Sequence, residues 1–104
     1  YAPEYVEAMW LMLQQKKPDD FVIANGETHT VKEFVETAFR RVGIKNYKKY
    51  IQIDKRYYRP NEVNLLCGDA SKARKILKWY PKTKFAELVN IMMDFELKNI
   101  GIKK

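Results

Sequence analysis

The sequence has few of the residue types that form disulfides or hold metal ions. Its 104 residues include one cysteine, Cys67, and one histidine, His29. One thiol cannot form an internal disulfide, and one cysteine with one histidine does not supply an ordinary zinc ligand set. We therefore expect neither a disulfide nor a metal site. The low cysteine content also favours a reducing compartment, so we expect a cytoplasmic location.

Glycine is scarce too, which argues against one kind of cofactor site. The 4 glycines are far apart in the chain, at Gly26, Gly43, Gly68 and Gly101. Each has a turn or a helix cap to fill. A loop that cradles the phosphates of a dinucleotide needs several glycines close together before a helix. The sequence therefore predicts no dinucleotide-binding loop in this chain.

Long apolar runs are also missing. No run approaches the ~20 residues that a membrane helix needs, so we expect no membrane partner. The chain starts at Tyr1 and enters a helical pattern almost at once, so we expect no signal peptide before this helix. We expect it to be a piece of a longer protein.

What the sequence does contain is typical of one globular domain with an anionic partner. Hydrophobic residues make up 46% and aromatic residues 13% of the chain, with no repeat or low-complexity tract. Lysine and arginine number 20 against 13 acidic residues, a formal net charge of +7. This excess favours nucleotides, nucleic acid or acidic surfaces, and its sign alone does not choose among them.

Apolar periodicity predicts two helices in the first half of the chain. The first runs over residues 4–15, and its apolar side chains wrap most of the circumference, which predicts burial on more than one side. The second begins at a capping box formed by Thr30 and Glu33 and continues to Gly43, a typical residue after a helix end.

Two more helices are predicted in the second half. Asp69 caps the third, with four side chains facing inward, and Trp79 closes it against the core. The inward residues are Ala70, Ala73, Ile76 and Leu77. Thr83 caps the last helix, which carries a broad apolar stripe and ends near Gly101.

Short apolar segments predict two or three strands between these helices. Residues 21–24 form a continuous apolar run, residues 50–53 alternate, and residues 63–67 are short and apolar. The expected fold class is α/β, with about four helices and two or three short strands in the order α-β-α-β-α-α. So few strands make a marginal sheet. We therefore expect the first helix and the first strand to belong to a larger sheet whose other strands lie upstream.

Residues 54–63 form the candidate binding loop, with two arginines, two tyrosines and carboxylates beside a proline. A guanidinium is a planar fork of donors suited to phosphate, and a carboxylate can accept hydrogen bonds from ribose hydroxyls or a base edge. Pro60 favours an extended, stiffened backbone at Arg59. The alternative interpretation is a solvated basic loop without a ligand.

Three other candidates favour structural interpretations. Tyr80 and Lys84 match a Tyr-x-x-x-Lys spacing, but Pro81 places them across a helix start, so we interpret the match as a coincidence. Cys67 lies in an apolar run and is expected to be a small core residue. His29 has no evident catalytic partner and is expected to be a loop residue.

Basic residues outside the loop leave a second function class open. They are Lys48, Lys49, Lys72, Arg74, Lys75 and Lys78. They could form a surface for nucleic acid, yet their spacing also suits the exposed faces of ordinary helices, and no recognised nucleic-acid motif accompanies them. We expect no nucleic-acid partner, and a basic nucleic-acid-binding module remains the alternative.

Three ordered segments resemble one enzyme family. Residues 1–10, 26–34 and 57–63, together with 68–73 and the region of Trp79, are similar to the carboxy-terminal part of GDP-mannose 4,6-dehydratases. The resemblance implies an extended short-chain dehydrogenase, whose amino-terminal Rossmann domain holds NADP and whose smaller carboxy-terminal region binds the GDP-sugar. It identifies residues 1–104 as that region, with residues 1–25 packing against the absent Rossmann domain.

The resemblance also implies roles for two residues. Arg59 would contact the GDP diphosphate and Glu62 a ribose hydroxyl. The family's catalytic and cofactor-binding residues lie upstream, so this chain would contain none of them and would bind no cofactor alone. The parent would convert GDP-mannose to GDP-4-keto-6-deoxymannose, and the isolated piece would be inactive.

The resemblance also implies partners for this chain, and it is compatible with more than one substrate. The implied partners are GDP-mannose and the Rossmann domain, in a homo-oligomeric parent. A relative acting on another GDP-sugar such as a GDP-heptose, or an epimerase, would look similar, as would an assembly domain without activity. The connection between Gly43 and Tyr50 is shorter than in some family members. Without the Rossmann part, the first helix and strand would expose apolar surface.

Overall fold

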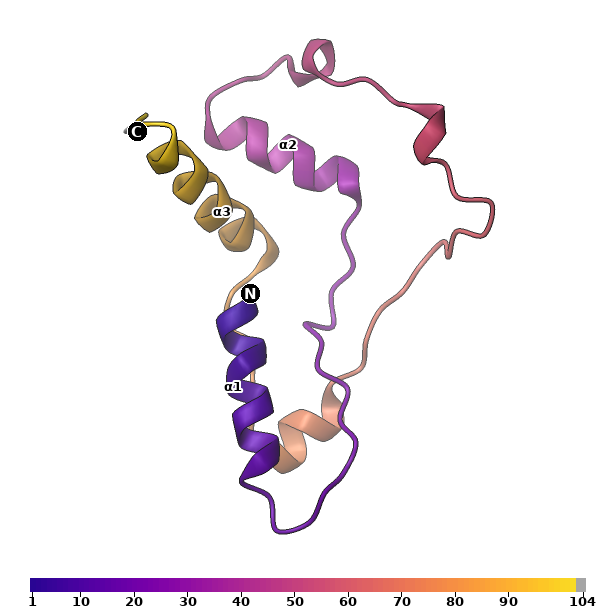
Figure 1. The fold of residues 1–104 in the computed structure, drawn as a ribbon, viewed down its shortest axis with the longest axis vertical. Helices are drawn as coiled ribbons and strands as arrows, with labels where there is room; N and C mark the ends of the chain where they lie inside the picture. Colours follow the sequence, from indigo (N-terminus) through magenta and orange to yellow (C-terminus); the bar gives the residue numbers. More distant parts are fainter. Residues whose placement is uncertain (103–104) are drawn as a thin grey trace. The chain divides into compact units, whose positions relative to one another are not determined.

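A computed structural model describes residues 1–102, which form helices joined by extended connections. In chain order the elements are α1 (Ala2–Leu13), α2 (Val31–Arg41), the 3-10 turns η1 (Tyr47–Tyr50) and η2 (Lys55–Tyr57), the π-helical turn η3 (Ala73–Leu77) and α3 (Phe85–Asn99) (Figure 1). The chain divides into two compact units: unit 1 comprises residues 1–28 and 65–84, and unit 2 comprises residues 29–64 and those from 85 onward. Among the described residues, no helix is long and apolar enough to cross a membrane.

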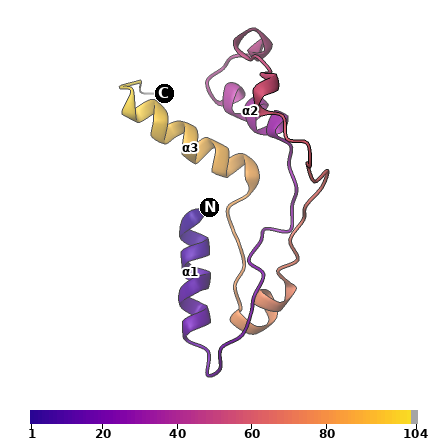
Figure 2. The ribbon, with the colours of Figure 1, turned by 45° about the vertical axis from the view of Figure 1, so that its right-hand side comes forward.

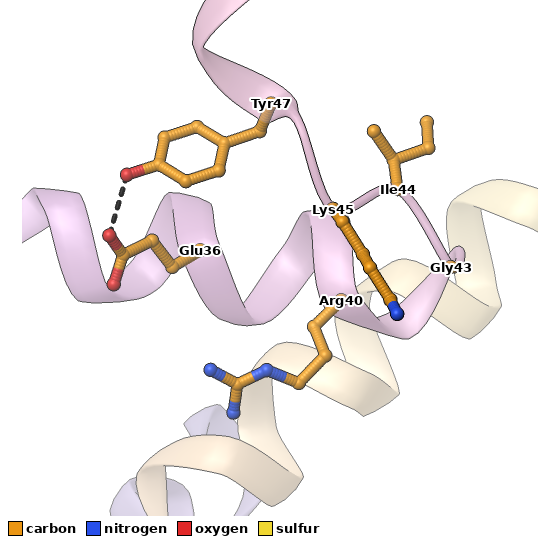
Figure 3. Close-up of a pocket in the computed structure, with 6 residues that line it drawn as sticks. All are labelled: Glu36, Arg40, Gly43, Ile44, Lys45 and Tyr47. Atoms are coloured by element: carbon orange, nitrogen blue, oxygen red, sulfur yellow. Dashed lines mark hydrogen bonds between the residues drawn. The ribbon is translucent and has the colours of Figure 1, made fainter.

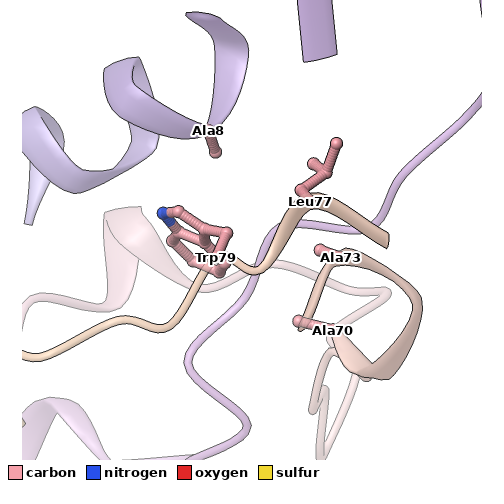
Figure 4. Close-up of a cluster of buried hydrophobic side chains, with 5 residues drawn as sticks. All are labelled: Ala8, Ala70, Ala73, Leu77 and Trp79. Atoms are coloured by element: carbon pink, nitrogen blue, oxygen red, sulfur yellow. The ribbon is translucent and has the colours of Figure 1, made fainter. Parts of the chain in front are cut away.

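Unit 1 is built around the indole ring of Trp79, which is 2% exposed. Small side chains from α1 and from the η3 region allow close packing around the ring (Figure 4). The indole N–H donates to the backbone carbonyl of Glu4 over 2.8 Å, and the Tyr5 ring meets the indole edge-on at a centroid distance of 5.8 Å. The predicted closure of the third helix against the core by Trp79 is confirmed.

The backbone around η3 directs Trp79 into this cluster. The Asp69 carboxylate accepts hydrogen bonds from the N–H, over 2.9 Å, and the hydroxyl of Ser71, as expected of a helix start. At the other end Lys78 is left-handed, with φ 56°. Such a conformation costs a non-glycine residue about 1 kcal/mol or more, which the burial of the neighbouring indole offsets. Ile76 was expected to face inward but is 45% exposed, because the wider π turn shifts its position around the helix.

Side chains hold the extended segment 19–28 against residues 66–72. Lys72 Nζ donates to the carbonyl of Asp20 over 2.8 Å and pairs with the Asp19 carboxylate at 2.9 Å. The hydroxyl of Thr28 donates to the carbonyl of Leu66 over 2.9 Å. These contacts fix the segment without the backbone ladder that a strand requires.

Gly68 lets the two stretches of unit 1 approach closely. A Cβ atom added to Gly68 would lie 2.4 Å from the Cβ of Ala24, a distance that van der Waals repulsion forbids. Gly68 was expected to fill a turn or a helix cap. Gly26, Gly43 and Gly101 have a left-handed backbone, whereas Gly68 does not. Glycine is therefore needed at position 68 because there is no space for a side chain, not because of its backbone conformation.

The outer surface of α1 remains apolar and uncovered in this chain. Ala8 is its buried residue, whereas four larger side chains are more than half exposed: Val6, Met9, Trp10 and Leu13. The prediction that this helix is buried on more than one side is therefore wrong for the chain as described. The apolar surface that the first helix was expected to expose is present on α1.

In unit 2, α2 begins and ends as its sequence predicts. The Thr30 hydroxyl accepts from the Glu33 N–H over 3.0 Å, and the Glu33 carboxylate accepts from the Thr30 N–H over 2.6 Å. This reciprocal pair is the predicted capping box. At the other end Gly43 has φ 79°, and its N–H donates to the Arg40 carbonyl over 3.0 Å.

The contact between α2 and α3 forms the core of unit 2. Val89 is fully buried and Leu97 is 9% exposed. The Phe34 and Phe85 rings pack edge to face at 6.3 Å, and Arg41 pairs with Asp94 at 2.6 Å. The predicted last helix and its end at a left-handed glycine are confirmed. The hydroxyl of Thr83, which was expected to cap this helix, donates to Glu4 instead.

Residues 44–64 follow α2 as a long loop with two short turns and lead to residue 65, where the chain enters unit 1 again (Figures 1 and 2). Tyr47 and Tyr50 both pack on Phe39, with ring centroids 5.9 Å away in each case. Residues three apart in a 3-10 turn lie on one side of it, so η1 lets both rings reach Phe39. This packing draws Tyr50 into a turn rather than into the strand predicted for residues 50–53.

The predicted α/β class is wrong for this chain. The structure has helices and no strand among residues 1–102. Each predicted segment has the apolar pattern of a strand, but a strand also needs a neighbouring backbone to pair with. The side chains of Phe21, Ile23 and Ala24 pack against the core of unit 1. Tyr50 belongs to η1, and residues 63–67 include a bend at Asn64 and form no backbone ladder with another described segment.

We expect Trp79→Ala to unfold unit 1, because it removes the largest member of a small core; such truncations cost about 3 to 5 kcal/mol. Trp10→Ala is the matched control, because Trp10 is 60% exposed on α1 and its loss removes little buried area. Urea unfolding followed by far-UV circular dichroism compares the two variants. Equal destabilisation by both would contradict the assigned role of Trp79.

Gly68→Ala should destabilise unit 1 by about 1 to 3 kcal/mol, because the new methyl overlaps Ala24 and pushes the two stretches apart. Ala24→Gly in the same chain removes the overlapping Cβ atom and should restore part of the loss. The free energy of unfolding of both single variants and of the double variant forms the test. Strictly additive losses would show that the two residues do not meet as described.

Candidate functional site

The candidate binding loop lies in unit 2 and is open to solvent. It begins with Asp54 and η2 and continues through Tyr58 in an extended conformation, φ −68° and ψ 134°. Residues 58–60 lie outside any helix. A non-helical backbone at Arg59 was expected, because Pro60 follows it. Tyr57 is 79% and Tyr58 68% exposed, so both rings are available for contact with a ligand or another protein surface.

Asp54 and Arg56 bind each other within this loop. Arg56 donates to the Asp54 carboxylate from its backbone N–H over 2.9 Å and from its Nε and Nη2 atoms, the latter over 2.6 Å. The side-chain hydrogen bonds from Arg56, followed by the backbone one, lower the pKa of Asp54 below its ordinary value. The guanidinium of Arg56 is therefore occupied by an internal partner.

Arg59 and Glu62 have no such internal partner in the described part of the chain. Both residues are exposed, and they lie on the loop after η2. The structure thus separates the two arginines of the loop, one neutralised by a neighbouring carboxylate and one free for an external anion. The sequence alone does not distinguish the two arginines, because the pairing of Asp54 with Arg56 depends on the backbone turn of η2.

The structure also describes the surroundings of Cys67, His29 and Lys84. Cys67 is exposed, so its assignment to the core is wrong, because the extended stretch around it is not covered. His29 stacks on Phe85 at a centroid distance of 3.9 Å, with its Nδ1 3.7 Å from the Glu33 carboxylate. Lys84 pairs with Glu27 at 2.8 Å. No group of His, Cys, Asp and Glu among the described residues could hold a metal ion.

A hollow at the carboxy-terminal end of α2 is a feature that sequence reasoning missed. Its volume is about 460 Å³. The lining residues come from α2 and from the chain that follows it: Glu36, Arg40, Gly43, Ile44, Lys45 and Tyr47 (Figure 3). In the sequence, the signal for this hollow is limited to a tyrosine, Tyr47, within a run of lysines.

The pairing in the loop predicts a low pKa for Asp54. Its contribution to the turn is present above the unfolded-state pKa and is lost as the pH falls through the lower folded-state pKa. In a carboxyl-carbon NMR titration, Asp54 should therefore titrate below the usual value of about 3.9. Arg56→Gln should raise the midpoint, whereas Arg59→Gln should leave it nearly unchanged. Equal effects of both variants would contradict the pairing.

The comparison with known families matches most of this chain to one of them. Residues 1–92 match the family model described as GDP-mannose 4,6 dehydratase. That range includes the whole candidate loop and the hollow.

Three relatives with this name illustrate the similarity. GDP-mannose 4,6 dehydratase 1 of Arabidopsis thaliana is 58% identical over 97 residues, 93% of this chain and 27% of the relative. The Dictyostelium discoideum relative is 49% identical, covering 96% of this chain and 33% of its own length. The Homo sapiens relative is 46% identical, covering 93% and 31%.

These matches cover only part of each relative. The chain spans about a quarter to a third of the length of the curated relatives that it matches. The human alignment extends over 115 residues and the Arabidopsis one over 97, although both cover 93% of this chain. The human relative therefore has residues within the matched region that this chain lacks. Since the family model matches most of the sequence, the chain belongs to the GDP-mannose 4,6-dehydratase family.

Proposed function

We propose that this chain is the carboxy-terminal, GDP-sugar-binding part of an enzyme that converts GDP-mannose to GDP-4-keto-6-deoxymannose. The observation that carries the proposal is the family match over residues 1–92, which includes the loop with Arg59 and Glu62. The +7 net charge supports an anionic ligand. A related GDP-sugar would use the same diphosphate and ribose contacts.

Arg59 is the residue that we assign to the diphosphate. Arg56 carries the same charge, but its guanidinium already donates to Asp54 over 2.6 Å. A phosphate would have to displace that carboxylate to bind Arg56, whereas the guanidinium of Arg59 is free to donate. Bidentate contacts of this kind are among the stronger hydrogen bonds in proteins.

Glu62 is the residue that we assign to a ribose hydroxyl. Its carboxylate is exposed on the same loop, three residues after Arg59. An ionised carboxylate only accepts hydrogen bonds, so it suits a hydroxyl donor and repels a phosphate. The cation and the carboxylate would therefore orient a nucleoside diphosphate, with the phosphates towards Arg59 and the ribose towards Glu62.

The chemistry itself belongs to the rest of the parent enzyme. We assign NADP there, because this chain has no glycine-rich phosphate loop to hold it. NADP would supply hydride transfer to and from the sugar, with loss of water across C5 and C6. This chain contributes positioning, and orienting reactants can be worth roughly 7 kcal/mol or more. We therefore propose that the 104 residues have no activity alone.

The apolar surface of α1 supports packing of residues 1–25 against the rest of the parent. Four large apolar side chains of this helix are more than half exposed. Covering one such side chain typically contributes about 1.5 to 3 kcal/mol. We further propose a homo-oligomeric parent. The single cysteine is our reason for a cytoplasmic location.

The parent enzyme carrying Arg59→Ala tests the proposed function. A lost charged hydrogen bond costs about 2 to 3 kcal/mol, so the KM for GDP-mannose should rise roughly 30- to 150-fold. The affinity for NADP should not change. Arg56→Ala is the matched control, because its guanidinium is held by Asp54, and its KM should stay near the wild-type value.

Two results would contradict the proposal. An unchanged KM in Arg59→Ala would remove this residue from the site, and an equal rise in both variants would point to general electrostatic attraction. Measurable turnover of GDP-mannose by the 104-residue chain alone would contradict the division of roles.

A further inference from the structure

The hollow at the end of α2 has the size of a small-molecule site. Its volume of about 460 Å³ falls within the roughly 300 to 1,000 Å³ typical of ligand pockets. It lies wholly within unit 2, between the last turns of α2 and the chain from Gly43 to Tyr47. None of its lining residues belongs to the loop that carries Arg59 and Glu62.

Tyr47 provides a fixed aromatic wall on one side of the hollow. Its hydroxyl donates to Glu36 Oε1 over 2.5 Å, as the close-up in Figure 3 shows. Its ring also packs on Phe39 at a centroid distance of 5.9 Å. A ring held from two sides loses little freedom on binding, and base stacking on aromatic rings is a strong contact that tolerates different bases.

Two unpaired basic side chains also line the hollow and can bind an anion. Arg40 and Lys45 are exposed, and neither has an acidic partner among the residues that the structure describes. Arg41, the neighbour of Arg40, is different, because it pairs with Asp94 at 2.6 Å. Free guanidinium and ammonium groups beside one hollow favour a phosphate.

The end of α2 does not cancel this attraction. Helix carboxy termini repel anions through their unpaired carbonyls. Here the carbonyl of Arg40 accepts from the Gly43 N–H and that of Phe39 from the Ile44 N–H, each over 3.0 Å. These turns satisfy two of the exposed carbonyls, and the basic side chains offset the remaining partial charge.

Glu36 adds an acceptor at the tyrosine end. Its Oε1 receives the Tyr47 hydroxyl, and the same oxygen lies 3.9 Å from Lys32 Nζ. Oε2 has no hydrogen-bond partner in the described structure. A carboxylate oxygen without a partner can accept a hydrogen bond from the amino group of a nucleobase, which is a donor and carries no negative charge.

We propose that this hollow binds a nucleoside monophosphate. The phosphate binds Arg40 and Lys45, the base stacks on Tyr47, and an amino group of the base donates to Glu36. This site is separate from the proposed GDP-sugar contacts at Arg59 and Glu62, and it does not depend on them.

Calorimetric titration of the 104-residue chain with adenosine monophosphate tests the proposal, because this probe carries both the phosphate and an amino group. Adenosine and inorganic phosphate should each bind at least ~10-fold more weakly, since each lacks one half of the contacts. Arg40→Gln and Lys45→Gln should each weaken the nucleotide by about 5- to 10-fold. Tyr47→Leu should weaken it by ~10-fold or more, whereas Tyr47→Phe should retain most of the stacking.

Two controls locate the site. Lys48→Gln removes the same charge from the same stretch at a residue that is not among the lining side chains, and it should change binding little. Arg59→Ala combined with Glu62→Ala should also leave binding unchanged, which distinguishes the hollow from the proposed GDP-sugar loop. Amide shifts of residues 43–47 in heteronuclear NMR should follow the same binding curve.

Several outcomes overturn the proposal. Inorganic phosphate binding as tightly as the nucleotide would indicate a nonspecific anion site. Equal losses in Lys48→Gln and Lys45→Gln would indicate general charge attraction. Loss of binding in the Arg59 and Glu62 double variant, or no saturable binding at millimolar nucleotide, would remove the hollow as a nucleotide site.

Discussion

The burial of one indole ring between α1 and η3 is the contact on which unit 1 depends. Trp79 lies 75 residues after Glu4, yet its N–H donates to the Glu4 carbonyl over 2.8 Å. The Glu4 carboxylate also accepts from the N–H groups of Lys82 and Thr83, over 2.8 and 3.0 Å. Desolvation raises the pKa of Glu4, but these hydrogen bonds outweigh it and lower the pKa overall. The first turn of α1, through Glu4, thus holds the segment from Trp79 to Thr83 in unit 1.

Features with local causes could be predicted from the sequence. The capping box of Thr30 and Glu33 needs only residues three apart, and both predicted hydrogen bonds are present. Gly43 could be placed at the end of α2 because a left-handed residue there favours glycine. Each of these signals involves partners within one or two helical turns, so distant parts of the chain cannot alter it.

Features that need distant partners could not be predicted in the same way. An apolar segment becomes a strand only beside another strand. In residues 21–24, Ala24 meets Gly68 instead, and Phe21 and Ile23 pack against the core of unit 1. The strand predicted for residues 21–24 is therefore wrong, because the apolar pattern does not supply a neighbouring backbone to pair with. The difference between Arg56 and Arg59 has a similar origin, because η2 decides which arginine Asp54 reaches.

The exposure of Arg59 sets how much this chain can contribute by itself. A charge pair 4 Å apart gains about 1 kcal/mol in bulk water and about 4 kcal/mol at an effective dielectric constant of 20. On an open loop the water value applies, and salt screens it further. The same guanidinium becomes a strong phosphate ligand only when other protein surface excludes water from the loop. The proposed inactivity of the isolated chain and the proposed importance of Arg59 in the parent therefore follow from one dielectric effect.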